Sequence, residues 1–177
     1  MELTPASDLS LRALSTLFAR AFEGYFVTIP DAPLLFDARV RGEHISLAES
    51  RIARVDGEPV GLVLMARRGR VSRVAGMGLV PSHRNRKLGA SLLLPLMDEA
   101  RARGDTRMVL EVIEQNTPAV TLYERLGFQR MRRLVGFVGT PTPEPAGLEE
   151  VEPLACARLL PDGLPWQLAP ATVAGLA

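Results

Sequence analysis

The segment that most constrains this chain is an apolar run that passes directly into a basic, glycine-bearing loop. The run spans residues 71–80, the loop follows it, and Gly89 lies just beyond the basic residues. Branched apolar residues predict a strand, and the periodic leucines from Leu88 onward predict a helix. A strand that leads into a helix start gathers backbone N–H groups and the positive end of the helix dipole, which together bind phosphate. The sequence therefore predicts a phosphate-binding loop over residues 85–90.

A second apolar run with polar side chains follows. Residues 108–113 predict a buried strand that contains Glu111, Asn116 can cap the next helix, and Tyr123 lies on that helix. An unpaired carboxylate in an apolar strand is costly, so we expect Glu111 to face water, to pair with an arginine or to act in a cleft. The closeness of the three side chains in sequence favours one shared cleft.

The remaining elements up to residue 139 predict an α+β domain with a mixed central sheet flanked by helices. Ser7 or Asp8 is expected to cap the first helix, Pro95 is expected to kink a later one, and Gly76 and Gly78 favour an irregular strand. Further strands are expected over residues 1–4, 51–55, 60–65, 71–80 and 128–138, and helical stretches over residues 11–22, 34–41, 88–104 and from 117.

Proline content changes sharply near the end of the chain. Residues 141–177 hold seven of the 14 prolines, at positions 141, 143, 145, 153, 161, 165 and 170. We therefore expect a domain over residues 1–139 and a proline-rich C-terminal extension over residues 140–177. The extension is too rich in proline to build its own core, yet it holds the single tryptophan, Trp166. It is predicted to pack on a domain surface and to support a homodimer.

Composition narrows the class of protein. A net charge of +1 and a pI near 8.0 give no reason to expect nucleic acid as a partner. The chain has no signal-like N-terminus and no apolar run long enough for a membrane span, which predicts a cytoplasmic protein without membrane attachment. Cys156 is the only cysteine, and His44 and His83 are the only histidines. No metal site is therefore expected.

Two of these segments resemble the GNAT superfamily of N-acetyltransferases. The family binds the pyrophosphate of acetyl-CoA with Gln/Arg-x-x-Gly-x-Gly/Ala, and this chain has Arg84 and Gly89 in that pattern with Lys87 in place of the middle glycine. Asn116 and the run Tyr123–Phe128 match the family's second motif at the expected spacing. The resemblance implies the same α+β fold, with parallel strands carrying Leu79 and Leu110 that splay apart.

The resemblance also implies roles for single residues. Tyr123 would be the general acid and Glu111, twelve residues before it, the general base, with Glu114 or a water chain as the alternatives. The acceptor site would border Tyr25, Phe26 and Ile29. The residues implied to bind the cosubstrate acetyl-CoA are Met77, Gly78, Leu79, Val80, Arg84, Asn85, Arg86, Lys87, Leu88, Gly89, Ala90 and Asn116.

The expected function is that of an acyltransferase that moves the acetyl group of acetyl-CoA to a primary amine, either a small molecule or a peptide N-terminus, by direct attack in a ternary complex. The alternative is a non-catalytic acyl-CoA-binding or regulatory module of the same fold. Lys87 in the loop favours that alternative, and the presence of Tyr123 and Asn116 counts against it. The identity of the amine does not follow from the sequence.

Overall fold

The structure is a computed structural model that describes residues 1–136, 152–161 and 163–174. The chain forms two compact units, Met1–Leu126 and Gly127–Ala177. The domain boundary expected at residue 139 stays a prediction. Each unit is described by itself.

The first unit is built on a five-stranded mixed sheet with the order β1-β2-β3-β4-β5. Successive strands pair antiparallel except for β4 and β5, which run parallel. The turn between β2 and β3 consists of Asp56 and Gly57, both with positive φ, as a two-residue hairpin turn that follows the twist of the strands requires. The mixed sheet confirms the predicted fold class. The strands are β1 (Glu2–Pro5), β2 (Ile45–Val55), β3 (Glu58–Arg68), β4 (Val71–Leu79) and β5 (Arg107–Leu110).

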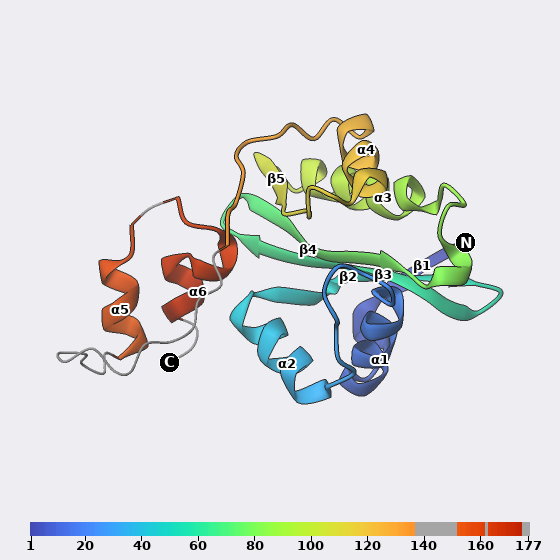
Figure 1. Cartoon of the computed structure of the whole chain (residues 1–177), viewed down its shortest axis with the longest axis horizontal. Helices are drawn as coiled ribbons and strands as arrows, with labels where there is room; N and C mark the ends of the chain where they lie inside the picture. The colour runs from blue at the N-terminus through green and yellow to red at the C-terminus, as the bar shows by residue number, and fades with distance from the viewer. Residues whose placement is uncertain (137–151, 162, 175–177) are drawn as a thin grey trace. The chain divides into compact units, whose positions relative to one another are not determined.

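Helices cover both faces of this sheet (Figure 1). α1 (Leu11–Ala21) and α2 (Pro33–Gly42) lie on one face, and α3 (Leu88–Ala102) and α4 (Thr117–Arg125) lie on the other. The cap of α1 is Ser10, which accepts from the Ala13 N–H at 3.2 Å. The expected caps Ser7 and Asp8 instead belong to a short 3-10 turn, Ala6–Asp8, that precedes the helix.

The core lies between the sheet and its helices. The middle of β3, residues 62–66, is buried on both faces, as are Leu92, Leu93 and Leu96 of α3. α3 continues through Pro95, which lies on its exposed side. The Ser91 carbonyl that loses its helical partner to this proline belongs to an exposed residue, so water can satisfy it.

β4 and β5 stop pairing part-way along the sheet. Their parallel ladder joins residues 71–74 to residues 107–110, and β4 then continues alone on that side to Leu79. The register with β3 shifts at this point, because Leu64 is opposite Gly76 and Met65 is opposite Val74. Ala75 is therefore the extra residue of a β-bulge. The bulge confirms the irregular strand, and the ladder confirms that β4 and β5 run parallel. The splaying that the resemblance implies stays a prediction.

Two expected strands differ from the structure. β5 ends at Leu110, so Glu111 follows the strand and does not lie inside it. The strand expected over residues 128–138 is not formed over residues 128–136, the part of it that the structure describes. Those residues are largely exposed, and strand formation depends on packing against a buried face, which this segment lacks.

The second unit contains α5 (Pro153–Leu159), a 3-10 turn at Trp166–Leu168 and α6 (Pro170–Ala174). Ala157, Trp166 and Thr172 are buried, and the Thr172 hydroxyl donates to the Trp166 carbonyl. Three prolines of the extension begin or flank these short helices, where a proline is tolerated. The expectation that the extension does not build a core of its own stays a prediction. No helix among the described residues is both long and apolar enough to cross a bilayer.

Candidate active site

The basic loop between β4 and α3 leaves the start of α3 open. Asn85 and Lys87 both have left-handed backbone conformations, with φ of 60° and 59°. Lys87 is the N-cap residue, and its side chain makes no capping hydrogen bond. The first N–H groups of α3 thus have no side-chain cap, and the exposed Arg86 and Lys87 add positive charge beside them. This arrangement suits an anion.

Arg84 differs from the exposed Arg86 and Lys87 because its guanidinium is hydrogen-bonded to backbone carbonyls. Its Nε donates to the Leu79 carbonyl at 2.9 Å, and its Nη2 donates to the carbonyls of Ala21 and Glu23 at 3.2 and 2.7 Å. The guanidinium therefore ties the loop to the end of α1. Arg84 therefore has a structural role in holding the loop in place. Its expected contact with the cosubstrate stays a prediction.

Gly89 provides close packing at the start of α3. A Cβ at this position would lie 2.7 Å from Cδ2 of Leu122 and 3.4 Å from Cε of Met77. The first turn of α3, with Leu88 and Ala90 on either side of Gly89, therefore packs between β4 and α4. This contact brings the loop, the end of β4 and the helix that carries Tyr123 into one place.

The end of β4 lies against α1. A Cβ at Gly78 would lie 2.9 Å from the Ala21 carbonyl oxygen, and a Cβ at Gly76 would lie 3.1 Å from Cε2 of Phe18. The N–H of Val80 donates to the Val60 carbonyl at 2.9 Å, and its side chain is buried. The N–H of Val80 is thus already used. The backbone of Met77, Gly78 and Leu79 lies beyond the point where β5 stops pairing.

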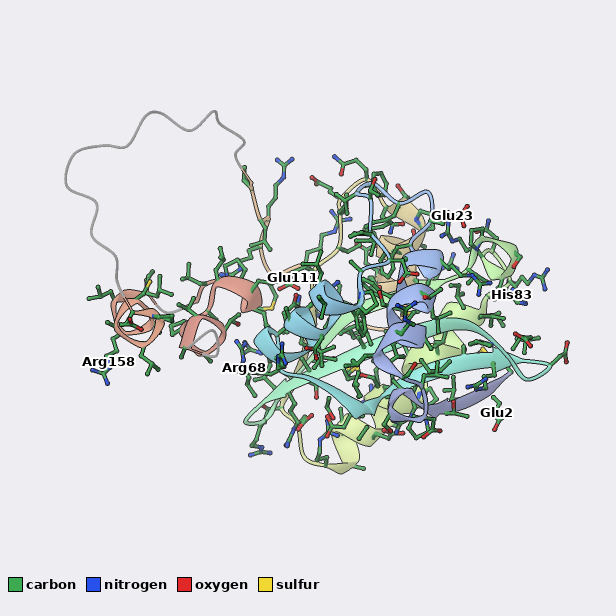
Figure 2. The ribbon with its side chains drawn as sticks, turned by 90° about the horizontal axis from the view of Figure 1, so that it is seen from below. Glu2, Glu23, Arg68, His83, Glu111 and Arg158 are labelled. Carbon is green, nitrogen blue, oxygen red and sulfur yellow. The ribbon has the colours of Figure 1, made fainter. Side chains whose placement is uncertain are left out.

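Glu111 is ion-paired. Arg73 Nε and Nη2 both donate to Glu111 Oε2 at 2.9 Å, and the Glu111 side chain keeps 29% of its surface exposed. This confirms one of the three environments expected for Glu111. Arg73 also contacts Glu43 at 2.5 Å, and Arg39 contacts the same carboxylate at 3.1 Å. Figure 2 shows Glu111 beside α2, the helix that supplies Arg39.

Tyr123 keeps its phenolic proton at neutral pH. Burial raises the pKa of Tyr123 to about 12, and the nearby Tyr25 adds to the shift in the same direction. Asn116 is the N-cap of α4, where its Oδ1 accepts from the Ala119 N–H at 3.4 Å. Pro118 occupies the second position of this helix. The cap uses the amide oxygen, so the amide NH2 group can donate to an acceptor on the protein or on a ligand.

A cavity of about 380 Å³ lies between the end of α1 and the loop that follows it. Two of the three residues expected at an acceptor site, Tyr25 and Ile29, line this cavity. Phe26 does not line it, but its ring meets that of Tyr25 edge-on at 5.3 Å and is 55% exposed. Tyr25 also contributes to the raised pKa of Tyr123 on α4.

The profile of the Acetyltransferase (GNAT) family matches residues 11–128, which include strands β2 to β5, the basic loop and α4. The chain belongs to the GNAT acetyltransferase family. No group of three or more His, Cys, Asp or Glu side chains within the described parts of this GNAT protein can hold a metal ion.

Individual GNAT proteins resemble the chain over different spans. The mycothiol acetyltransferase of Thermobifida fusca is 32% identical over 108 residues, which is 60% of this chain and 29% of that protein. The ribosomal-protein-S18-alanine N-acetyltransferase of Escherichia coli has a TM-score of 0.60 at 22% identity, covering 74% of this chain and 79% of the other. An aminoglycoside N-acetyltransferase in complex with CoA has a TM-score of 0.55 at 19% identity, covering 78% and 92%.

The chain spans less than a third of the length of the curated relatives that it matches. The likeness to the solved structures concerns the fold alone. It supports the mixed sheet with helices on both faces. The ligands and substrates named for those proteins belong to those proteins and are not assigned to this chain by the likeness.

Sequence reasoning missed Arg73, Glu43 and Arg39. One signal for Arg73 was present, because it interrupts the apolar run of residues 71–80 in the same way that Glu111 interrupts the run of residues 108–113. Opposite charges in two neighbouring apolar strands indicate a buried pair. No comparable signal marks Arg39 or Glu43, which lie on α2 and its C-cap among other charged residues.

Proposed function

We propose that this chain transfers an acetyl group from acetyl-CoA to a primary amine by direct attack of the amine in a ternary complex. The observation that carries the proposal is the junction at Gly89, which packs the open start of α3 against Met77 of β4 and Leu122 of α4. The open start of α3, the part of β4 that no longer pairs with β5, and the helix that carries the Tyr123 phenol are thereby neighbours. Family membership supports acetyl transfer as the reaction.

The loop fits the phosphates of acetyl-CoA. An uncapped helix start attracts anions through its N–H groups and its dipole, and the exposed Arg86 and Lys87 strengthen that attraction. The absence of a side chain at Gly89 keeps the first turn of α3 close to β4. We infer that residues 85–90 hold the pyrophosphate, while the backbone of residues 77–79 takes the pantetheine and acetyl end.

Proton transfers are assigned to two side chains. Acetyl-CoA supplies the acetyl group as a thioester. Tyr123, whose pKa is raised to about 12, carries a proton that it can donate to a leaving thiolate. Glu111 is held through Oε2 by Arg73, and its Oε1 can accept a proton from the attacking amine directly or through water. Glu114, which is exposed, is the lesser candidate for this base.

The acceptor is assigned to the cavity beside α1. Tyr25 and Ile29 line it, and Tyr25 is near enough to contribute to the raised pKa of Tyr123. The wall contains the charged residues Arg20 and Glu23 as well as apolar side chains, which suits an amine on a partly apolar carrier. A homodimer supported by the C-terminal extension and a cytoplasmic location stay predictions from the sequence, and sedimentation with and without residues 141–177 tests the first.

A second function is favoured by one observation. Lys87 adopts a left-handed conformation that costs an L-residue energy, at the position where the family motif has glycine. A loop altered in this way could serve a module that binds acyl-CoA without turning it over. Such a module would bind CoA in calorimetry and release no thiol with any amine.

One assay separates the two functions. Purified protein is incubated with acetyl-CoA and a panel of amines that includes aminoglycosides, peptides with N-terminal alanine and simple amino sugars, and the free thiol is measured. Amine-dependent thiol release, with the acetylated amine identified by mass spectrometry, supports the transferase. Saturable CoA binding without thiol release across the panel supports the binding module.

A further inference from the structure

Four side chains of alternating charge form a continuous network beneath the point where β4 and β5 stop pairing. Arg39 Nε contacts Glu43 Oε1 at 3.1 Å, Arg73 Nη1 contacts Glu43 Oε2 at 2.5 Å, and Arg73 contacts Glu111 Oε2 at 2.9 Å. Arg39 also stacks over the ring of Phe18, 5.0 Å from its centroid. The network therefore runs from α1 and α2, across β4, to the residue that follows β5.

The burial of this network is unusual for charged groups. The Arg73 side chain is 2% exposed and that of Glu43 is 14% exposed. Removing a guanidinium and a carboxylate from water costs free energy that their attraction barely repays, and apolar side chains of the same size would often stabilise the fold as well or better. Stability alone is thus a weak reason for an arginine at position 73, and fixed geometry is a stronger one.

One end of the network contacts β4, and the other end contacts the residue that follows β5. Arg39 Nη2 donates to the carbonyl of Ala75 at 2.7 Å. Ala75 is the extra residue of the β4 bulge, so its carbonyl is one that the strand ladder does not pair in the regular way. At the other end, Arg73 fixes Glu111 directly after β5. One set of charges therefore determines where β4 lies relative to the Glu111 carboxylate.

We propose that Arg73, together with Glu43 and Arg39, forms a positioning network that sets the distance between the free end of β4 and Glu111. Under the proposed function, on which this inference rests, the end of β4 receives the thioester and Glu111 receives the amine. None of the three residues touches substrate. Their effect is on the alignment of the two reactants, and a misplacement of about 1 Å can cost about 10²-fold in rate.

The experiment compares three variants of the full chain with one matched control. Arg73→Met, Glu43→Gln and Arg39→Met each interrupt the network at a different link. Arg67→Met is the control, because Arg67 also pairs with a buried carboxylate, that of Asp105 at 2.9 Å, but lies on β3 away from Glu111. For each protein we measure kcat and KM, the affinity for CoA by calorimetry, the melting temperature, and amide hydrogen exchange over residues 75–80.

The positioning role predicts a distinct pattern. Arg73→Met lowers kcat by about 10²-fold and leaves the affinity for CoA unchanged, while Arg39→Met accelerates amide exchange over residues 75–80. Arg67→Met lowers the melting temperature and changes neither kcat nor that exchange. The double variant Arg73→Met/Glu43→Gln loses no more activity than Arg73→Met alone, because both changes break one network.

Two results overturn the inference in different ways. If the three variants lose only melting temperature, as the control does, the network is structural and the proposed function stands. If the wild-type chain releases no thiol with any amine, the proposed function fails and the positioning role fails with it. Should Arg73→Met not fold, Glu43→Gln and Arg39→Met decide the question, since both residues are more exposed and their unchanged kcat and exchange would reject the network.

Discussion

Arg73 donates two hydrogen bonds to a single oxygen of Glu111, from Nε and Nη2 at 2.9 Å each. Both bonds converge on Oε2, so the geometry of the pair leaves Oε1 outside it. The Glu111 side chain is partly exposed, whereas Arg73 is buried. A carboxylate that is anchored through one oxygen can use the other oxygen to accept a proton, or a hydrogen bond from an ammonium group, without moving.

Glu111→Gln tests this carboxylate directly. The change keeps the size of the side chain and removes its charge, so we expect kcat/KM to fall by about 10²-fold or more, within the range for loss of a positioned base. The acidic limb of the pH profile should change and the affinity for CoA should not. Glu114→Gln is the matched control, and a loss confined to that variant would assign the base to Glu114.

Tyr123→Phe removes the expected proton donor with little change in volume. We expect kcat to fall by about 10²-fold while the affinity for acetyl-CoA stays close to that of the wild type. Steady-state kinetics and calorimetry measure the two quantities. Turnover equal to that of the wild type would mean that Tyr123 only packs on the inner face of α4.

The same residue has a spectroscopic signature. The folded-state pKa of Tyr123 is raised to about 12 from the ordinary tyrosine value of about 10, so the folded protein holds this proton more tightly than the unfolded chain does. The associated stability is complete below about pH 10 and is lost as the pH rises through about 12. The chain has two tyrosines. A tyrosinate absorbance titration should show a late step that is missing in Tyr123→Phe, and an unchanged titration in that variant would contradict the assignment.

Asp105 is expected to make stability depend on acidic pH. It accepts from Arg103 at 2.7 Å, from Arg67 at 3.0 Å and from Ser72, and these partners, Arg103 first, hold its pKa well below the usual range. Because the folded-state pKa is lowered, this stability is present above about pH 4 and is lost as the pH falls below it.

Asp105→Asn should therefore lower the free energy of unfolding by about 3 kcal/mol at pH 7, as for loss of one partner of a buried ion pair. The difference from the wild type should shrink towards pH 2, which urea denaturation at both pH values measures. Asp98→Asn is the control, because its pair with Arg101 is exposed and is worth less than about 1 kcal/mol. Equal losses in the two variants would remove the special role of Asp105.

Lys87 combines backbone strain with a charge, and two substitutions separate them. Lys87→Gly removes both and should raise the free energy of unfolding by about 0.5–1 kcal/mol, because glycine adopts positive φ without strain. Lys87→Ala removes only the charge, so it should weaken CoA binding and reduce its salt dependence without the gain in stability. Denaturation and calorimetry at two salt concentrations measure these effects. CoA affinity in Lys87→Ala equal to that of the wild type would show that the ammonium group has no part in binding.

The fold was largely predictable because its signals are local. The hairpin turn at Asp56 and Gly57, the helical spacing of Leu14 and Phe18, and the apolar run of β3 each follow from a short stretch of sequence. The strand expected over residues 128–138 was wrong for its described part. Its composition suits a strand, but strand formation depends on a partner and a buried face that a local pattern does not contain.

The site was predictable only where a motif gives it. The loop at residues 85–90 and the position of Tyr123 come from contiguous residues, and the structure brings their elements together at Gly89. The partner of Glu111 is different, because Arg73 lies on another strand and Glu43 at the end of a helix on one face of the sheet. Pairs of that kind depend on strand register and helix packing. The role of Arg84 was hidden for the same reason, since its three carbonyl partners come from α1, its following turn and β4.

The most direct measurement is the release of free thiol from acetyl-CoA by the wild-type chain as each amine of the panel is added, with the product identified by mass spectrometry. We expect release that depends on both protein and amine, an acetylated amine as product, and no acetylated protein accumulating before the amine is supplied. Thiol release that is independent of every amine, or a stable acetylated protein that forms first and then passes the group on, would contradict direct acetyl transfer at this site.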